Sequence, residues 1–250
     1  MDYKYNKLFF DPISDRNFAP GILLIILGAF ITIIAIALFQ EGKVGGGVIL
    51  LIIIPGLVYL GIFLLKNAIK FNSNKEIVTA YHLDKACEDH LKNLKLMALK
   101  KLGIDEDEVK EAEPIYFHYY YWDDIPDSTV RWHKDKDCDD LYRSSHYNAV
   151  MFLFSKDQVF CYNYRFSNIE ERKQEITNEF FYNDIVSVTT ESQVKKHASS
   201  SAVVKYEYFK LTTSGATSID AMVLVGESTE RSINAMKSLF RSKKATIAKK

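Results

Sequence analysis

Residues 21–39 read GILLIILGAFITIIAIALF and residues 48–65 read VILLIIIPGLVYLGIFLL, and neither segment contains a charged side chain. At about 1.5 Å of rise per residue, each forms a helix of about 28 Å, close to the ~30 Å hydrocarbon core of a bilayer. A buried helix of a soluble protein is rarely apolar on every face over such a length. The sequence therefore predicts two transmembrane helices.

The short connection between these segments favours an antiparallel hairpin, because residues 40–47 include four glycines. Pro55 and Gly56 interrupt the second span, and the proline removes one helical hydrogen bond. Such a break can line a transport site, but the lack of charge in both spans favours a simple kink. The triplet 35–37 is similar to a signal-peptide cleavage site, yet the apolar run is too long for one, so we expect the span to be retained.

Lys and Arg gather on the two outer flanks of the predicted hairpin. Three lie before residue 21 and three lie within residues 66–75, whereas the connection has one. Positive residues favour the cytoplasmic side, so we expect both termini and the soluble domain in the cytoplasm. The predicted division is 1–20 as a cytoplasmic N-terminal segment, 21–66 as the transmembrane hairpin, 67–113 as a helical stalk, and 114–250 as a soluble domain with a basic C-terminal tail.

The stalk region carries a helical pattern. Between residues 76 and 102, apolar residues recur at steps of three and four, which indicates one buried helix face. The members of this face are Ala80, Leu83, Cys87, Leu91, Leu94, Ala98 and Leu102. Asp105 and Glu108 have the spacing of a capping box and predict a short second helix. The polar segment 71–74 favours a break near the membrane surface.

After Pro114 the pattern becomes an alternation rich in aromatic and β-branched residues, which is typical of strands. We expect strands at 115–121, 129–133, 148–155, 159–166, 174–182, 185–190, 203–212 and 217–225, and a final helix at 228–243. Short connections between successive strands favour an antiparallel arrangement. The aromatic run from Tyr116 to Trp122 favours packing on both faces of its strand over a surface that binds a partner.

Three runs in this part resemble bacterial PH-like domains. They are VMFLFSKDQVFCY at 150–162, EFFYNDIVSV at 179–188 and FKLTTSG at 209–215. The whole layout is similar to uncharacterised bacterial two-helix membrane proteins with a cytoplasmic PH-like domain. The resemblance covers residues 115–243 and implies an α+β membrane protein of the inner membrane, with an antiparallel β-barrel capped by a C-terminal helix. Residues 135–140 and 167–173 depart from a minimal barrel of this type.

The sequence carries no nucleophile elbow, phosphate-binding glycine loop or dinucleotide fingerprint. We therefore expect no enzymatic activity and no cofactor, and the net charge of zero favours no nucleic-acid partner. Cys138 and His146 are weak candidates for metal ligands beside the alternating acids Asp135, Asp137 and Asp139. A solvated acidic loop is the favoured interpretation of this stretch.

Two basic groups are the strongest local signals of binding. Lys195 and Lys196 lie in one predicted loop, and Arg241, Lys243 and Lys244 lie near the C-terminus. Each such charge near an anionic leaflet contributes about 1 kcal/mol of attraction. The candidate contacts of these residues are anionic lipid head groups or a protein partner, and the alternative is that they only solubilise the chain.

Two functions remain open at this stage. The first is a non-enzymatic, membrane-anchored module whose PH-like domain binds a protein partner, another copy of the chain or anionic lipid. Small residues in the spans, such as Gly28, Ala29 and Gly61, favour close helix packing and make a homo-oligomer a candidate assembly. The second is a ligand-gated membrane effector in signalling or defence, whose soluble domain senses a small molecule and rearranges the hairpins.

Overall fold

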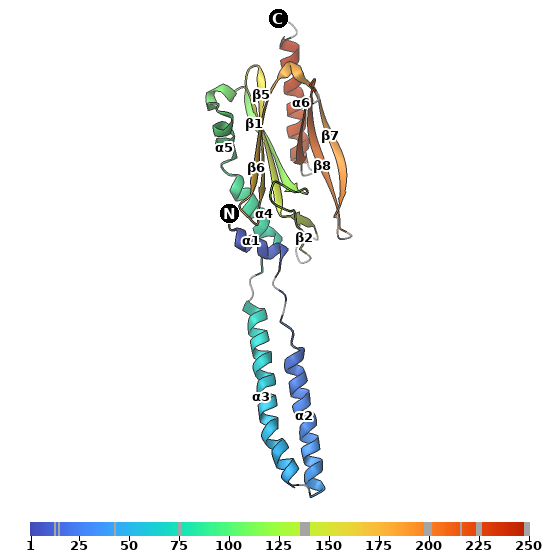
Figure 1. Cartoon of the computed structure of the whole chain (residues 1–250). Coiled ribbons are helices and arrows are strands. Elements are labelled where there is room, and N and C mark those ends of the chain that lie inside the picture. Colours follow the sequence, from blue (N-terminus) through green and yellow to red (C-terminus); the bar gives the residue numbers. More distant parts are fainter. Residues whose placement is uncertain are drawn as a thin grey trace. The chain divides into compact units, whose positions relative to one another are not determined.

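The chain forms two compact units, and one of them is interrupted in sequence by the other. The computed structural model describes residues 1–12, 14, 16–42, 44–74, 77–135, 141–197, 202–215, 217–223 and 227–247. The hairpin unit comprises residues 12–77, and the sheet unit joins residues 1–11 to residues 78–250 (Figure 1). Residues 1–11, expected to precede the hairpin as a separate segment, therefore belong to the sheet unit.

The hairpin unit consists of α2 (Ala19–Gln40) and α3 (Val44–Asn74), which run side by side in opposite directions (Figure 1). Both are long and apolar enough to cross a membrane, and only 11% and 6% of their most apolar windows are buried. Such low burial is unlike the core helices of soluble proteins. Ile52 and Tyr59 show the same feature, with 74% and 73% of their surfaces exposed.

The second helix extends past the break that the sequence predicts after the second span. It contains Pro55 within its length and extends through residues 71–74, where we expected a break. The next described residues, 77–79, are not helical. The break therefore lies a few residues later in the chain than predicted.

Small residues allow α2 and α3 to approach closely. Gly21, Gly28 and Ala35 are the buried residues of α2 and lie seven positions apart. A Cβ added to Gly61 of α3 would lie 2.9 Å from the Gly21 carbonyl oxygen and 2.8 Å from Ile25 Cγ1. One added to Gly28 would lie 2.9 Å from a side chain of α3. Gly28 and Gly61, which the sequence suggested for self-association, thus serve contacts inside one hairpin.

Gly61→Leu is expected to destabilise the hairpin by about 1–3 kcal/mol, because the new side chain meets backbone that cannot move aside without separating the helices. Gly56→Leu is the control, since a Cβ there meets nothing within 4 Å. Dyes on the exposed positions Leu23 and Phe63 report helix separation by energy transfer during an SDS titration. Equal midpoints for the two variants would contradict the close approach at Gly61.

The sheet unit contains four α-helices and two 3-10 helices among its described residues. They are α1 (Tyr3–Phe10), α4 (Ala80–Leu91), α5 (Leu94–Leu102), η1 (Glu106–Val109), η2 (Tyr182–Asp184) and α6 (Glu227–Ile247). The strands are β1 (Ala112–Tyr121), β2 (Trp132–Lys134), β3 (Tyr142–Ser144), β4 (His146–Phe154), β5 (Gln158–Ser167), β6 (Lys173–Phe181), β7 (Ile185–Lys196), β8 (Val203–Thr213) and β9 (Ser218–Val223).

The described strands form three antiparallel sheets, none of which closes into the expected barrel. Their orders are β1-β4-β5-β6, β7-β8-β9 and the small pair β2-β3. An apolar core lies between the two larger sheets, and α6 contributes Ile233, Met236 and Phe240 to it. Antiparallel sheets with a C-terminal helix packed on their core are therefore confirmed.

Helices α1, α4 and α5 contribute to a second core on the other face of the four-stranded sheet. All nine residues of β4 are buried for this reason. The predicted apolar face of residues 80–102 faces this core, but the helix breaks at Lys92 and Asn93 and lies on the sheet (Figure 1). The aromatic run from Tyr116 to Trp122 packs on both faces of β1 because the sheet has a core on each side. Phe117 lies in the first core and Tyr120 in the second.

The largest differences between the predicted and the observed strands concern β3 and β7. Strand β3 was not expected, and β7 continues to Lys196 instead of ending at residue 190. The last eight residues of β7 are mostly exposed and polar, so they lack the alternation that marks a half-buried strand. Strand β3 has only three residues, too few for a pattern.

Candidate functional site

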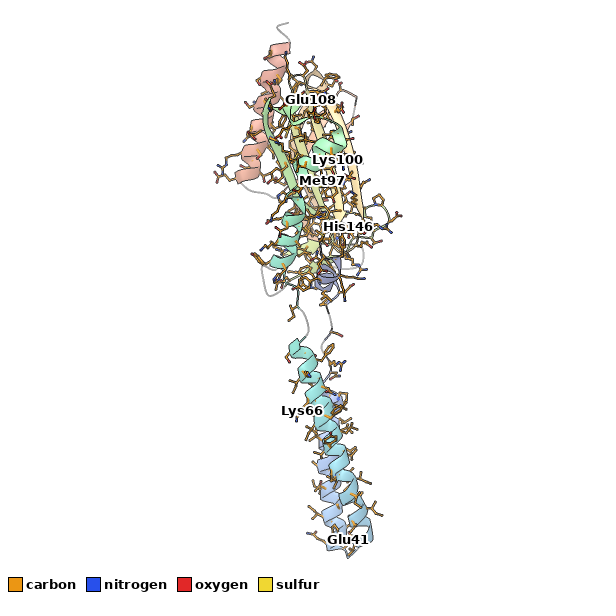
Figure 2. All side chains as sticks on the ribbon, turned by 90° about the vertical axis from the view of Figure 1, so that its left-hand side faces the viewer. Glu41, Lys66, Met97, Lys100, Glu108 and His146 are labelled. Atoms are coloured by element: carbon orange, nitrogen blue, oxygen red, sulfur yellow. The ribbon has the colours of Figure 1, made fainter. Side chains whose placement is uncertain are left out.

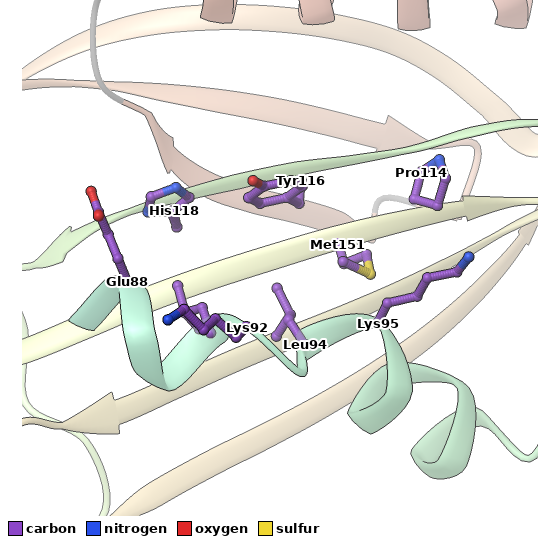
Figure 3. A pocket seen from close by; sticks show the side chains of 9 residues that line it. Glu88, Lys92, Leu94, Lys95, Pro114, Tyr116, His118 and Met151 are labelled. Carbon is purple, nitrogen blue, oxygen red and sulfur yellow. The ribbon is translucent and has the colours of Figure 1, made fainter. Parts of the chain in front are cut away.

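An open cavity of about 500 Å³ lies between the α4–α5 pair and β1, and we call it the α4–β1 groove (Figure 3). Its lining combines apolar side chains with a few charged ones. The lining residues are Glu88, Leu91, Lys92, Leu94, Lys95, Pro114, Tyr116, His118 and Met151. A cavity of this size and composition is typical of a binding site.

Local sequence features keep this groove open. Leu91 and Leu94 are 9% and 2% exposed and flank the break between α4 and α5, so both helices rest on the sheet there. Among the described strands, β1 forms its ladder with β4, and the register shifts between Ala112 and Ile115. Pro114 lies in this shift, where its missing N–H costs no ladder hydrogen bond.

The charges at the groove differ in their partners. Lys92 Nζ lies 2.8 Å from Asp89 Oδ1, and Lys95 pairs with Glu106. Glu88 makes no ion pair with any residue that the structure describes. Beside it, the rings of Tyr116 and His118 stack with centroids 5.6 Å apart. The groove therefore offers an unpaired carboxylate next to an aromatic surface.

A second cavity of about 260 Å³ shares Glu88 and His118 with the groove and continues toward Tyr147. Burial lowers the pKa of His118, and the Glu88 carboxylate opposes that shift. Burial also raises the pKa of Tyr147, so its hydroxyl stays protonated. The 2.9 Å contact of this hydroxyl with His118 Nδ1 is then best assigned as O–H donating to a neutral imidazole.

A buried ion pair supports the far wall of this second cavity. Arg143 NH2 donates to Asp84 Oδ2 at 2.9 Å, and the Arg143 side chain is 8% exposed. The Tyr120 hydroxyl donates to Asp84 Oδ1 at 2.5 Å. These contacts join α4 to β1 and β3, so they hold one wall of the groove in place.

Ser128, His146 and Glu170 come together in a cluster that sequence reasoning missed. His146 Nε2 lies 2.8 Å from Ser128 Oγ, which also contacts Glu170, and His146 Nδ1 lies 2.8 Å from the Asp123 carbonyl oxygen. A catalytic triad needs the acid on the imidazole, whereas here the acid contacts the serine. Ser128 is also only 7% exposed. The cluster therefore ties loops together, at the end of the sheet unit where Figure 2 labels His146.

The metal hypothesis finds no support in the geometry around His146. Both of its ring nitrogens already have hydrogen-bond partners, and Cys138 lies outside the described residues. Within the described ranges, no group of three or more His, Cys, Asp or Glu side chains is placed to hold a metal ion. Cys87 and Cys161 are buried free thiols.

The cluster predicts a pH dependence of stability. Burial lowers the pKa of His146 to about 4, against the opposing effects of Asp124 and Glu170. The unfolded chain, with a His pKa near 6.5, therefore binds more protons between these values. The free energy of unfolding is expected to be highest above about pH 6.5 and to fall by on the order of 3 kcal/mol toward pH 4. Urea unfolding at several pH values measures this slope.

His146→Gln is expected to remove most of this slope, while His82→Gln on the exposed face of α4 keeps it. Burial also lowers the pKa values of His90, His118 and His133. These residues contribute to the slope in the same direction in the unaltered protein and in both variants. An unchanged slope in His146→Gln would show that its imidazole is not the main titrating group.

The five predicted basic contacts lie at two opposite ends of the sheet unit. Lys195 pairs with Asp123, near the end that carries α1. Lys243 pairs with Glu111 and contacts the Lys156 carbonyl oxygen in the β4–β5 turn, at the other end. The nine residues of β4 run between these ends and span about 30 Å. The two basic groups are therefore separate clusters and do not form one continuous patch.

Both points where the chain leaves for the hairpin unit are fixed beside β2. Asp11 pairs with Arg131, just before β2, and the Ala80 N–H donates to Asp135 Oδ2 at 2.9 Å, just after it. Phe9 packs on His133 of β2, with ring centroids 5.0 Å apart. We call these contacts the β2 clasp. It holds the chain segments before α2 and after α3 next to each other.

Comparison of the chain with protein-family models, curated proteins and solved structures finds no match. The geometry of the groove, the clasp and the basic ends is therefore what bears on function.

Proposed function

We propose that the protein is a membrane-anchored, non-enzymatic binding module, and that an extended segment of a protein partner binds beside β1. The observation that carries this proposal is the pair of cavities flanking residues 114–118 of β1. The α4–β1 groove lies on one side, and a cavity of about 360 Å³ lined by Val223, Thr229 and Ser232 lies on the other. Between them the described residues of β1 form ladder hydrogen bonds with β4, and β9 and α6 also lie close to β1.

This geometry suits a peptide strand. The outer edge of a strand presents N–H and C=O groups to an added strand, and alternate side chains of that strand point to opposite faces. A segment beside β1 would place its side chains in the two cavities in turn. The unpaired Glu88 favours a basic side chain among those on the groove side, where Leu94 and Met151 provide apolar contact.

A defined peptide pair tests this. The full-length protein in nanodiscs is titrated with a ten-residue peptide that alternates Val and Lys and with its counterpart that alternates Val and Asp, by fluorescence anisotropy. The basic peptide is expected to bind saturably, and Glu88→Lys to weaken it at least tenfold. Glu179→Lys, an exposed acid on β6 at the other edge of the sheet, is the matched control. Equal loss in both variants, or no peptide preference, would overturn the proposal.

The sheet unit fits a PH-like domain in its strand order. Four antiparallel strands precede three, and a C-terminal helix packs on the core between them. Strands β2 and β3 and helices α4 and α5 are additions to that plan. We place the unit at the cytoplasmic face of a bacterial inner membrane, because Lys and Arg flank the outer ends of the spans. A C-terminal alkaline phosphatase fusion is expected to be inactive, and one at Gly42 active.

Anionic lipid is the second expected contact, at the clasp end. The link from Asp11 to Ala19 has seven intervening residues, which reach at most about 25 Å. Lys196 at this end is exposed and lies one residue from the pair formed by Lys195 and Asp123. Lys196 is therefore the proposed contact with anionic lipid, and the C-terminal basic group lies at the other end of the sheet unit.

The β2 clasp favours a second candidate function, the ligand-gated effector. Helix α4 lines the groove and follows α3, while α1 precedes α2 and contacts α4 through Tyr5 and His82, whose ring centroids are 6.3 Å apart. A ligand that moves α4 would thus act on both ends of the hairpin. Dye release from proteoliposomes separates the two functions, since peptide-dependent release supports the effector and peptide binding without release supports the module.

A further inference from the structure

A third cavity, of about 320 Å³, lies between the start of β7 and the last turns of α6, and we call it the β7–α6 pocket. It is separate from the α4–β1 groove and shares none of its residues. Its lining contains three basic residues and no acidic one. The lining residues are Ile185, Val186, Ser187, Val188, Lys237, Phe240, Arg241 and Lys244.

The three basic residues share one face of α6. Lys237, Arg241 and Lys244 follow each other at steps of four and three, so they are neighbours on the helix surface. Lys244 Nζ donates to the Ile185 carbonyl oxygen. Lys237 and Arg241 form no ion pair with any described residue. Like charges at this spacing repel each other. A bound anion would relieve this repulsion.

Lys243 on the same helix shows the contrast. It lies outside the pocket, and its charge is already matched by Glu111. Glu111 therefore neutralises Lys243 and none of the three basic residues that line the pocket.

The start of β7 adds neutral donors opposite these charges. Strand β7 is the outer strand of its sheet, and its register with β8 shifts between Ile185 and Ser187. Val186 lies in the shift, has no register partner and is 63% exposed. A guanidinium fork, two ammonium groups, the Ser187 hydroxyl and strand-edge N–H groups together match the several oxygens of a phosphate group.

We propose that the β7–α6 pocket binds the phosphate group of a soluble ligand. The position of the pocket favours a soluble ligand over a lipid head group as the source of the phosphate. The pocket lies at the end of the sheet unit opposite the β2 clasp, about 30 Å away along β4. The chain connects to the hairpin unit from the clasp end and not from the end that holds the pocket, which favours a soluble source over the head groups of the same bilayer. This proposal does not rest on the peptide site at β1.

The experiment uses full-length protein in zwitterionic nanodiscs, titrated calorimetrically with inorganic pyrophosphate. Saturable binding is expected, with at least tenfold weaker affinity for Arg241→Gln and for Lys237→Gln. Lys100→Gln is the matched control, because it removes one exposed charge from α5 and is expected to stay within twofold of the unaltered protein (Figure 2). Unchanged melting temperatures show that each variant is folded.

A second arm identifies the source of the phosphate. The same titration is repeated in nanodiscs rich in phosphatidylglycerol, with the Lys100→Gln protein as the reference for the effect of the negative disc surface on pyrophosphate affinity. Relative to that reference, the affinity of the unaltered protein for pyrophosphate is expected to be the same in both kinds of disc. Loss of pyrophosphate binding in the anionic discs alone would assign the pocket to lipid head groups and overturn the soluble source. No saturable binding in either disc, or equal affinity for Arg241→Gln, would overturn the pocket itself.

Discussion

Asp84→Ala is expected to lower the free energy of unfolding of the sheet unit by about 3 kcal/mol. The substitution removes the Asp84 carboxylate from the Arg143 guanidinium, on a side chain that is 8% exposed. Breaking a buried ion pair by removing one partner typically costs about 3–5 kcal/mol, and the 37% exposure of the Asp84 side chain places this pair at the lower end. The Tyr120 hydroxyl also loses its acceptor.

Urea unfolding followed by tryptophan fluorescence measures this loss, since Trp122 and Trp132 both lie in the sheet unit. Asp89→Ala is the control on the same helix. The pair of Asp89 with Lys92 is solvent-exposed, so its removal is expected to leave the free energy of unfolding nearly unchanged. Arg143→Met tests the pairing itself, because the double variant Asp84→Ala, Arg143→Met should lose less than the sum of the single losses. Equal effects of Asp84→Ala and Asp89→Ala would contradict a structural role for the buried pair.

Phe9→Ala is expected to release α1 from the sheet unit and to cost about 3–4 kcal/mol. Phe9 is 3% exposed and packs edge-on against Phe10 and His133, with centroids 5.1 Å and 5.0 Å away. An isolated helix of eight residues is marginal in water, so packing decides whether α1 forms. Hydrogen exchange should accelerate in α1 and in β2 together.

Lys4→Ala, on the exposed side of α1, is the matched control and should leave exchange in β2 unchanged. Fast exchange of α1 in the unaltered protein would contradict the inclusion of this helix in the sheet unit. Exchange that accelerates in α1 but not in β2 would show that the two are not coupled through Phe9.

Features that depend on short-range pattern could be predicted from the sequence. The spans follow from apolar length, and the buried face of residues 80–102 follows from its spacing. The capping box also formed, since the Asp105 N–H donates to Glu108 Oε1 at 2.9 Å. Each of these needs only residues that are near one another in the chain.

Features that depend on distant partners could not be predicted. The burial of Phe9 depends on His133, more than a hundred positions away. The groove exists because α4 crosses beside β1, and no local pattern sets that placement. The basic residues illustrate the same limit, because Lys195 and Arg241 have similar surroundings in sequence. The two residues differ in their ion-pair partners. Lys195 pairs with Asp123, whereas Arg241 has no ion-pair partner among the described residues.

The interrupted sheet unit has a consequence for biosynthesis. Helix α1 leaves the ribosome before both spans, whereas the clasp residues around β2 are made about 120 positions later. On the proposed topology, α1 therefore has no packing partner until the spans have been inserted and β2 has been made. A chain in which only one span crossed the bilayer would hold α1 and β2 on opposite sides and leave the Phe9 site empty. On the proposed membrane topology, we therefore expect a wrongly inserted chain to lack a complete sheet unit and to expose the apolar surface that Phe9 covers.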